Sequence, residues 1–208
     1  MNRVISCLVF PLLAICFLAR IQSTYAVQIV RGPYLQIKTA TNCIVRWRTD
    51  TPSDSRVQFG LTHTNLDRAV ELTGARTNHE VAIGGLSPYT AYYYSVGSST
   101  GVLASGTSYR FVTAPIGAKP IRIWAIGDSG TADSGPASVR DGYMTFTGAR
   151  YTDVWLMLGD NAYSASTEAQ FDAAVFGMFP ELFRQIALWP ERGNDDAFGG
   201  YFDAFTLP

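Results

Sequence analysis

The sequence of 208 residues predicts two folded units in tandem, an all-β sandwich followed by an α/β unit built on a parallel sheet. Residues 28–114 form short segments of alternating apolar and polar residues separated by turn residues, which is typical of sandwich strands. Residues 121–208 instead begin with two continuous apolar runs that flank a helical pattern, as buried parallel strands do. Residues 115–120 lie between the units, contain two prolines and a glycine, and are predicted to form a linker.

Composition supports folded units and argues against one class of partner. Hydrophobic residues make up 47% of the chain, which is enough to build a core. The formal net charge is −1, so the chain lacks the basic surface that binding to nucleic acid requires. Nucleic acid is therefore not an expected partner.

The first 26 residues have the pattern of a secretory signal peptide. Arg3 precedes an almost wholly apolar run over residues 4–19, and small residues lead up to Ala26. We expect cleavage after Ala26, with an uncleaved membrane anchor as the alternative. The mature protein is then predicted to be secreted, periplasmic or extracellular, with no stable membrane insertion.

Cysteine usage indicates a mature chain without an internal disulfide. Cys7 and Cys16 lie in the predicted signal peptide, which leaves Cys43 alone. Cys43 precedes Ile44 and Val45 in a predicted strand, so a buried and inert thiol is expected, with a reactive thiol as the alternative.

The first unit is predicted to contain seven strands, with Trp47 as the central core aromatic. These strands cover residues 31–36, 43–48, 56–59, 69–72, 79–83, 91–96 and 109–112. The pattern Leu86-x-Pro88-x-Thr90-x-Tyr92 resembles the tyrosine corner of fibronectin type III domains, in which a tyrosine hydroxyl bonds to upstream backbone.

Other aromatic residues of the first unit receive a structural interpretation. Tyr92, Tyr93 and Tyr94 could line a carbohydrate-binding face, but alternation across a strand is the favoured interpretation. His63 and His79 are the only histidines, and they lie far apart in a loop and at a strand start. They are not expected to form a metal-binding pair.

The second unit is predicted to alternate strands with helices. Residues 121–126 and 154–158 are the two apolar strands, and Gly135-Pro136 is a suitable start for the helix between them. Val139, Tyr143 and Phe146 follow at helical spacing and are expected to form its buried face.

A second helix is expected after the second strand. Thr167 and Gln170 have the spacing of a capping box. The apolar face of this helix is predicted to consist of Phe171, Ala174, Val175 and Met178, before Pro180 interrupts the pattern. The order strand, helix, strand, helix indicates a right-handed parallel α/β unit.

A carboxylate follows each of the two predicted parallel strands. Asp128 and Asp160 each stand after a glycine, and ligands bind at the carboxyl ends of strands in open α/β sheets. Two converging carboxylates repel each other unless a proton or a cation lies between them. Tyr163 and Asn194 add a phenol and an amide oxygen, and this oxygen-rich set suits a hard metal ion, with phenolate favouring iron(III).

Three blocks of sequence resemble the purple acid phosphatases, which belong to the calcineurin-like metallophosphoesterases. These blocks are Gly-Asp-Ser-Gly at 127–130, Gly-Asp-Asn-Ala-Tyr at 159–163 and Leu-Trp-Pro-Glu-Arg-Gly-Asn at 188–194. The sandwich, beginning near Arg-Gly-Pro-Tyr at 31–34, resembles the amino-terminal domain of the same family.

The resemblance implies an acid phosphatase that hydrolyses phosphate monoesters at a dinuclear metal centre. It implies that Asp160 bridges two ions and that Asp128 and Tyr163 bind the first, Fe(III). It also implies that Asn194 binds the second ion, which is Zn, Mn or Fe(II).

Two departures from the family pattern qualify this expectation. The family has a histidine that helps to hold phosphate where this chain has Asp195, so no catalytic residue is assigned. The family takes three further ligands from later histidines, and residues 121–208 contain no histidine. We therefore expect an incomplete α/β metallophosphoesterase domain that is inactive alone, with a partial sequence favoured over a natural pseudoenzyme. The alternative function is a non-catalytic secreted binding module.

Overall fold

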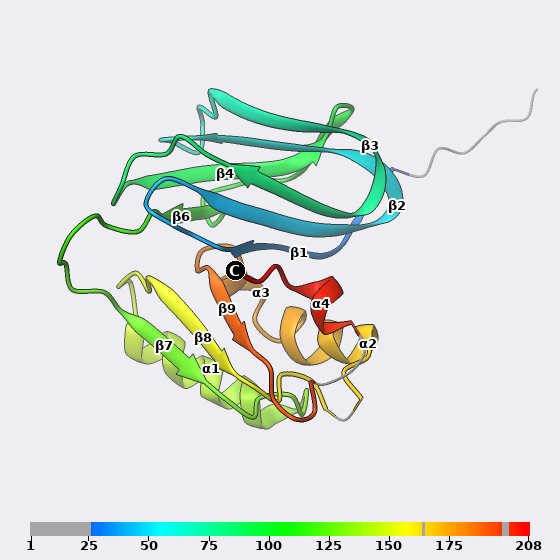
Figure 1. The fold of residues 1–208 in the computed structure, drawn as a ribbon, viewed down its shortest axis with the longest axis vertical. Coiled ribbons are helices and arrows are strands. Elements are labelled where there is room, and N and C mark those ends of the chain that lie inside the picture. Colours follow the sequence, from blue (N-terminus) through cyan, green and yellow to red (C-terminus); the bar gives the residue numbers. More distant parts are fainter. Residues whose placement is uncertain (1–25, 164, 197–199) are drawn as a thin grey trace, which may run out of the picture.

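The computed structural model describes residues 26–163, 165–196 and 200–208. Figure 1 shows two layered units, a β-sandwich and an α/β unit, joined by an extended segment between β6 and β7. Apart from Ala26, the predicted signal peptide lies outside the described residues.

Six antiparallel strands form the sandwich predicted for the first unit. They are β1 (Ile29–Gln36), β2 (Cys43–Gly60), β3 (Arg68–Ile83), β4 (Ala91–Ser98), β5 (Gly101–Ala104) and β6 (Arg110–Val112). β5 was not predicted; it is a short strand that pairs with β4.

Two long strands connect the layers of the sandwich. The sequence predicted four short strands over residues 43–83, but β2 and β3 each continue through their turn-like residues. The first half of β2 pairs with β1 and its second half pairs with β4. Register shifts between Arg48 and Ser55 interrupt the β2–β3 ladder, and such bulges bend a strand without ending it.

The core of the sandwich confirms the predicted roles of its aromatic residues. Trp47 is buried and stacks on His79, with ring centroids 4.6 Å apart. The hydroxyl of Tyr92 accepts a hydrogen bond of 3.0 Å from the backbone N–H of Ser87, which is the predicted tyrosine corner. Tyr92 and Tyr94 are buried whereas Tyr93 is partly exposed, so the strand alternates as predicted.

Cys43 has the buried, inert environment that the sequence predicted. Its side chain is fully buried, and burial raises the pKa of the thiol to about 12. The thiolate that would react is therefore scarce at neutral pH.

The second unit contains a three-stranded parallel sheet in the order β7-β8-β9. Its elements are β7 (Ile123–Ile126), α1 (Ser134–Thr147), β8 (Val154–Leu158), α2 (Glu168–Phe171), the π-helical turn η1 (Asp172–Phe176), α3 (Pro180–Phe183), β9 (Leu188–Glu191) and α4 (Tyr201–Ala204). β9 was not predicted, and it contains Pro190. Among the described strands β9 lies at the edge of the sheet, where a proline is tolerated.

The predicted buried face of the first helix is wrong in two of its three positions. Val139 and Phe146 of α1 are 52% and 70% exposed. Asp133 caps the helix by accepting a hydrogen bond of 2.8 Å from Gly135, and α1 packs Ala137 and Tyr143 against the core instead. Tyr143 stacks on Trp124, with ring centroids 4.2 Å apart.

The predicted start and apolar face of the second helix are confirmed. Thr167 and Gln170 form the capping box at the start of α2. All four residues of the predicted face are buried, namely Phe171, Ala174, Val175 and Met178. The chain passes from α2 directly into η1, so this face is continuous.

Strand β1 joins the sandwich to the second unit. Tyr34 packs against Phe176 and Phe183, and its hydroxyl donates a hydrogen bond of 2.6 Å to the carbonyl of Ala204. Arg31 is buried and forms ion pairs with Asp172 at 2.6 Å and with Glu168 at 3.2 Å. Figure 1 shows β1 facing α3, α4 and the carboxyl terminus.

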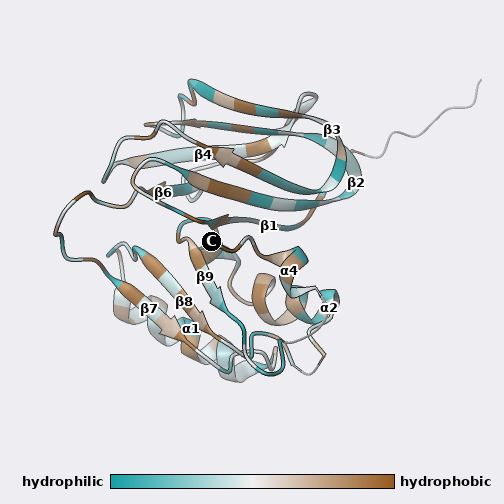
Figure 2. Ribbon diagram, in the orientation of Figure 1, coloured by the Kyte–Doolittle hydropathy of each residue, from teal (hydrophilic) through white to brown (hydrophobic). Residues whose placement is uncertain are grey.

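One face of the parallel sheet is open to solvent in the described part of the chain. Ile123 and Leu158 are 52% and 57% exposed, and β8 is brown along much of its length in Figure 2. Within the described residues, no helix combines the length and the apolarity needed to cross a bilayer.

His79 should make the stability of the sandwich depend on pH. Both ring nitrogens lie 2.9 Å from a hydroxyl, of Thr49 and Ser55, and burial lowers the pKa of His79 to about 4. The unfolded chain then binds more protons than the folded chain between about pH 6.5 and pH 4, so stability should fall as the pH falls through this window. The loss should reach up to about 3 kcal/mol.

Urea unfolding at pH 7.5 and pH 4.5, followed by tryptophan fluorescence, measures this effect. The His79→Gln variant keeps a polar side chain that does not titrate, so its stability should change less between the two pH values. An equal change in both proteins would show that His79 does not cause it.

Tyr34 should contribute strongly to global stability because it fills the core of the second unit from a strand of the first. Tyr34→Ala should lower the free energy of unfolding by about 3–5 kcal/mol, the usual result for a buried aromatic residue. Tyr34→Phe removes the hydrogen bond to the Ala204 carbonyl and should lower the free energy of unfolding by about 1–3 kcal/mol. Tyr89→Phe is the matched control, because the Tyr89 side chain is 52% exposed. It should change the free energy of unfolding by less than about 0.5 kcal/mol.

Candidate metal centre

The two predicted carboxylates lie at the same edge of the parallel sheet. β7 and β8 pair with Ile126 opposite Met157, and the backbone N–H of Asp128 donates a hydrogen bond of 3.1 Å to the carbonyl of Gly159. The ladder therefore continues beyond both strands, and it brings Asp128 beside the Gly159-Asp160 turn.

Both aspartates have a left-handed backbone. Their φ angles are +53° for Asp128 and +52° for Asp160, a region that residues other than glycine seldom occupy. Strained backbone of this kind often occurs at functional sites. Gly159 has a φ of +96°, as expected for a sharp turn, whereas φ of Gly127 is not positive, so Asp128 itself makes the left-handed turn after β7.

Tyr163 lies between the two carboxylates. Its hydroxyl is 3.3 Å from Oδ1 of Asp128 and 3.4 Å from Oδ2 of Asp160. Partial burial and the two negative charges raise the pKa of Tyr163 to about 12. Three oxygen atoms that the sequence assigned to one site therefore converge.

The third block approaches this cluster through Gly193. A Cβ atom added at Gly193 would lie 2.0 Å from Oδ1 of Asp160 and 2.3 Å from its backbone nitrogen, so only glycine fits there. The backbone N–H of Asp195 donates a hydrogen bond of 3.1 Å to Oδ1 of Asp160.

Asn194 lies on the same loop but is not shown in contact with the other predicted ligands. Its side chain is exposed, and its amide donates a hydrogen bond of 3.4 Å to the carboxylate of Asp195. Asp195 is partly buried beside Asp160. The structure thus brings Asp128, Asp160 and Tyr163 together and places Asn194 at their border.

Sequence reasoning missed the buried residues behind the loops. Asp196 is fully buried, and so is Asn161, whose side-chain amide donates a hydrogen bond of 2.7 Å to it. The neighbouring Asp195 stands where the family resemblance implies a histidine. Asp195 is only partly buried, and nothing in the local sequence distinguishes it from the fully buried Asp196 that follows it.

The residues present fit part of a site for a hard metal ion. Asp128, Asp160 and Tyr163 offer only oxygen atoms, which hard ions prefer. The described residues include no group of three His, Cys, Asp or Glu side chains arranged to hold a metal. Ser129, next to Asp128, is buried, and its hydroxyl has no hydrogen-bond partner in the described part of the chain.

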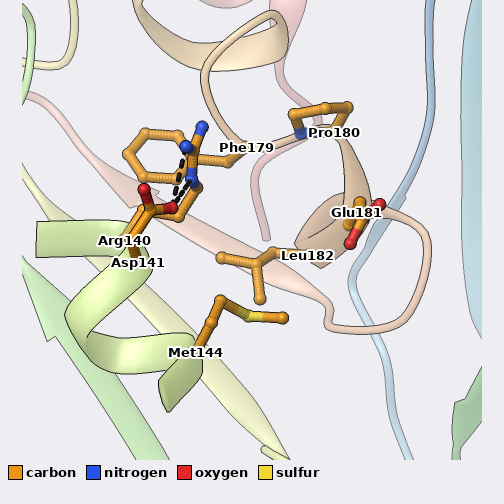
Figure 3. A pocket seen from close by; sticks show the side chains of 7 residues that line it. All are labelled: Arg140, Asp141, Met144, Phe179, Pro180, Glu181 and Leu182. Atoms are coloured by element: carbon orange, nitrogen blue, oxygen red, sulfur yellow. Dashed lines mark hydrogen bonds and ion pairs between the residues drawn. The ribbon is translucent and has the colours of Figure 1, made fainter. Parts of the chain in front are cut away.

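Two other features do not compete with this cluster as a functional site. A hollow of about 380 Å³ lies between α1 and α3, but no predicted site residue lines it, and Arg140 there is already paired with Asp141 (Figure 3). His79 is buried between two hydroxyls and His63 packs on Tyr93, so neither histidine is shown near a metal ligand.

The first unit matches a known family of domains. Residues 30–113 match the family model described as purple acid phosphatase, N-terminal domain. This match confirms the resemblance for the amino-terminal part of the chain. No curated protein matches the sequence.

Solved structures extend the likeness in fold beyond the sandwich. A structure of PhoD matches with a TM-score of 0.58 and 10% identity over 81% of this chain. The chain spans 39% of that protein, and at this identity the likeness shows the fold alone.

Two further matches each cover less than half of this chain. The sensor domain of the anti-sigma factor RsgI4 from Pseudobacteroides cellulosolvens has a TM-score of 0.33 and 14% identity, over 45% of this chain and 100% of that one. The FN1–FN3 domains of chicken CNTN1 have a TM-score of 0.32 and 14% identity, over 40% of this chain and 30% of that one.

Gly193→Ala should disrupt the packing of the third loop on Asp160. The added methyl group overlaps Oδ1 of Asp160, so the loop must move and the Asp195–Asp160 hydrogen bond should break. We expect a loss of about 1–3 kcal/mol in the free energy of unfolding, as for other overpacked sites.

Gly142→Ala is the control for the Gly193 substitution. Gly142 is an exposed residue of α1, and nothing lies within 4 Å of its added Cβ. This change should stabilise the protein by about 0.5–1 kcal/mol. Urea unfolding compares the two variants, and equal stability would contradict the tight packing at Gly193.

Proposed function

We propose that this chain supplies ligands to a dinuclear metal centre that hydrolyses phosphate monoesters, as in an acid phosphatase. The observation that carries the proposal is the convergence of Asp128 and Asp160 on the hydroxyl of Tyr163. The match of residues 30–113 to the purple acid phosphatase N-terminal domain supports the same class of activity. The predicted signal peptide adds the proposal that the enzyme is secreted.

The donor set suggests how two ions would be shared. Asp160 would bridge them, Asp128 and Tyr163 would hold Fe(III), and Asn194 would hold Zn, Mn or Fe(II). The bound ions would supply Lewis acidity toward a phosphoryl group and would offset the repulsion between the carboxylates.

The exposure of the cluster suits a substrate that arrives from solvent. Asp128 is exposed and Asp160 is partly buried, so the carboxylates lie at the surface and not in a closed core. The backbone strain at both aspartates indicates that their positions are held by the surrounding loops, which favours a fixed geometry for ion binding.

Asp195 and the missing histidines should limit turnover by this chain alone. The backbone N–H of Asp195 bonds to Asp160, and its carboxylate accepts a hydrogen bond of 3.4 Å from the amide of Asn194, a proposed ligand. Asp195 therefore brings a negative charge to the edge of the proposed site of an anionic substrate. Two unit charges about 4 Å apart repel by roughly 4 kcal/mol at an effective dielectric constant near 20. The family resemblance implies three histidine ligands, and residues 121–208 contain none.

Iron binding tests the proposal directly. The protein should bind Fe(III) with a visible phenolate-to-iron absorption band. Tyr163→Phe should abolish the band, and Asp160→Asn should weaken binding at least about tenfold because it removes a charged ligand. Asp141→Asn, on the exposed surface of α1, is the control and should bind as the wild type does. Absence of binding by the wild type would refute the metal centre.

Activity provides a separate measurement. With iron and zinc present, hydrolysis of p-nitrophenyl phosphate by this chain should be little or none. Robust hydrolysis that Asp160→Ala abolishes would show that the described ligands suffice for catalysis.

A non-catalytic secreted binding module is the second candidate, and it is favoured by Asp195, which stands where the family resemblance implies a histidine. Retention of the protein on cell-wall glycans, unaffected by Asp160→Asn, would support this candidate. No retention would count against it.

A further inference from the structure

Asp196 is a buried carboxylate that the proposed metal chemistry does not use directly. Its Oδ2 atom accepts hydrogen bonds from Asn161 N–H at 3.0 Å, from the Asn161 side-chain amide at 2.7 Å and from Gly193 N–H at 3.1 Å. Its Oδ1 atom is 3.1 Å from the same Asn161 nitrogen and 3.4 Å from the hydroxyl of Ser166. No lysine or arginine among the described residues pairs with it.

Burial of this carboxylate requires these donors. A charged group that loses water is tolerated only where hydrogen bonds replace the lost hydration. Bonds from N–H groups to an ionised carboxylate are stronger than bonds between neutral groups. The donors of Asp196 therefore form a tight connection between two loops, and removal of the carboxylate would leave several buried N–H groups unpaired.

The two loops that Asp196 connects carry the proposed ligands of different ions. Asn161 directly follows Asp160, and Gly193 directly precedes Asn194. The same turn orients Asp160, because Asp195 N–H bonds to Oδ1 while Oδ2 faces the Tyr163 hydroxyl. The Asn161 amide also donates a hydrogen bond of 2.8 Å to the carbonyl of Glu191. The spacing between the two loops thus depends in part on Asp196, which is not a proposed ligand of either ion.

We propose that Asp196 is a positioning residue that holds the loop of Asn194 against Asp160 and so sets the geometry of the metal centre. The inference rests on the proposed function for its consequence, ion binding. The connection between the loops can be measured without metal.

Three variants test the role of Asp196. Asp196→Ala removes the hydrogen bonds between the loops. Asp196→Asn keeps one acceptor oxygen and so some of these bonds, and it provides a milder variant in case Asp196→Ala does not fold. Asp153→Ala is the matched control, because Asp153 accepts a hydrogen bond of 2.8 Å from Arg122 N–H at the opposite end of the same strands. Urea unfolding identifies how much each change lowers stability.

Fe(III) titration, read by the visible absorption band, is the first measurement. Asp196→Ala should bind at least about tenfold more weakly and retain the band at saturation, because Tyr163 is still present. Asp196→Asn should lie between Asp196→Ala and the wild type, and Asp153→Ala should bind as the wild type does. Wild-type affinity in Asp196→Ala, or equal weakening in Asp153→Ala, would overturn the positioning role.

Amide hydrogen exchange of the metal-free protein is the second measurement. The amides of Asn161, Gly193 and Asp195 should be protected in the wild type and should exchange much faster in Asp196→Ala, but not in Asp153→Ala. Protection retained in Asp196→Ala would overturn the inference. Fast exchange in Asp196→Ala together with no iron binding by the wild type would support the loop connection and reject the metal centre.

Discussion

The parallel register of β7 and β8 is the constraint on which the candidate site depends. Ile126 lies opposite Met157, and the ladder continues to the bond between Asp128 and Gly159. Side chains of a strand alternate between its two faces, so a slip of one residue would send Asp128 away from Asp160. The meeting of the carboxylates with Tyr163 follows from this register together with the two left-handed turns.

The sequence was sufficient where a local rule decides the structure. Gly159-Asp160 after an apolar run predicted a strand-end turn, Thr167 and Gln170 predicted a helix start, and Tyr92 predicted the corner of the sandwich. Each of these features depends on residues that are close together in the chain. The capping box and the tyrosine corner form hydrogen bonds between residues that are three and five positions apart, and the turn at Gly159 needs a residue that tolerates a positive φ. The local sequence alone therefore indicates them.

Features that depend on distant partners were missed. Val139 and Phe146 have helical spacing, but α1 packs through Ala137 and through the stacking of Tyr143 on Trp124, which leaves Val139 and Phe146 exposed. The residues between Arg48 and Ser55 look like a turn, yet pairing with β3 keeps them in one bent strand. From the sequence alone Asp196 looks like a surface residue, but in the structure it is buried and bonded to the loop that carries Asn161.

Strand β1 belongs to both hydrophobic cores, because Leu35 packs inside the sandwich and Tyr34 packs among the aromatic residues of the second unit. A hybrid protein made by exchanging the units at residues 115–120 would therefore inherit a mismatched β1 surface. Arg31 adds to this limit, since its two acidic partners lie on α2 and η1. The sandwich and the second unit should therefore be exchanged together in recombination, in evolution or in the laboratory, because β1 contributes to the core of both.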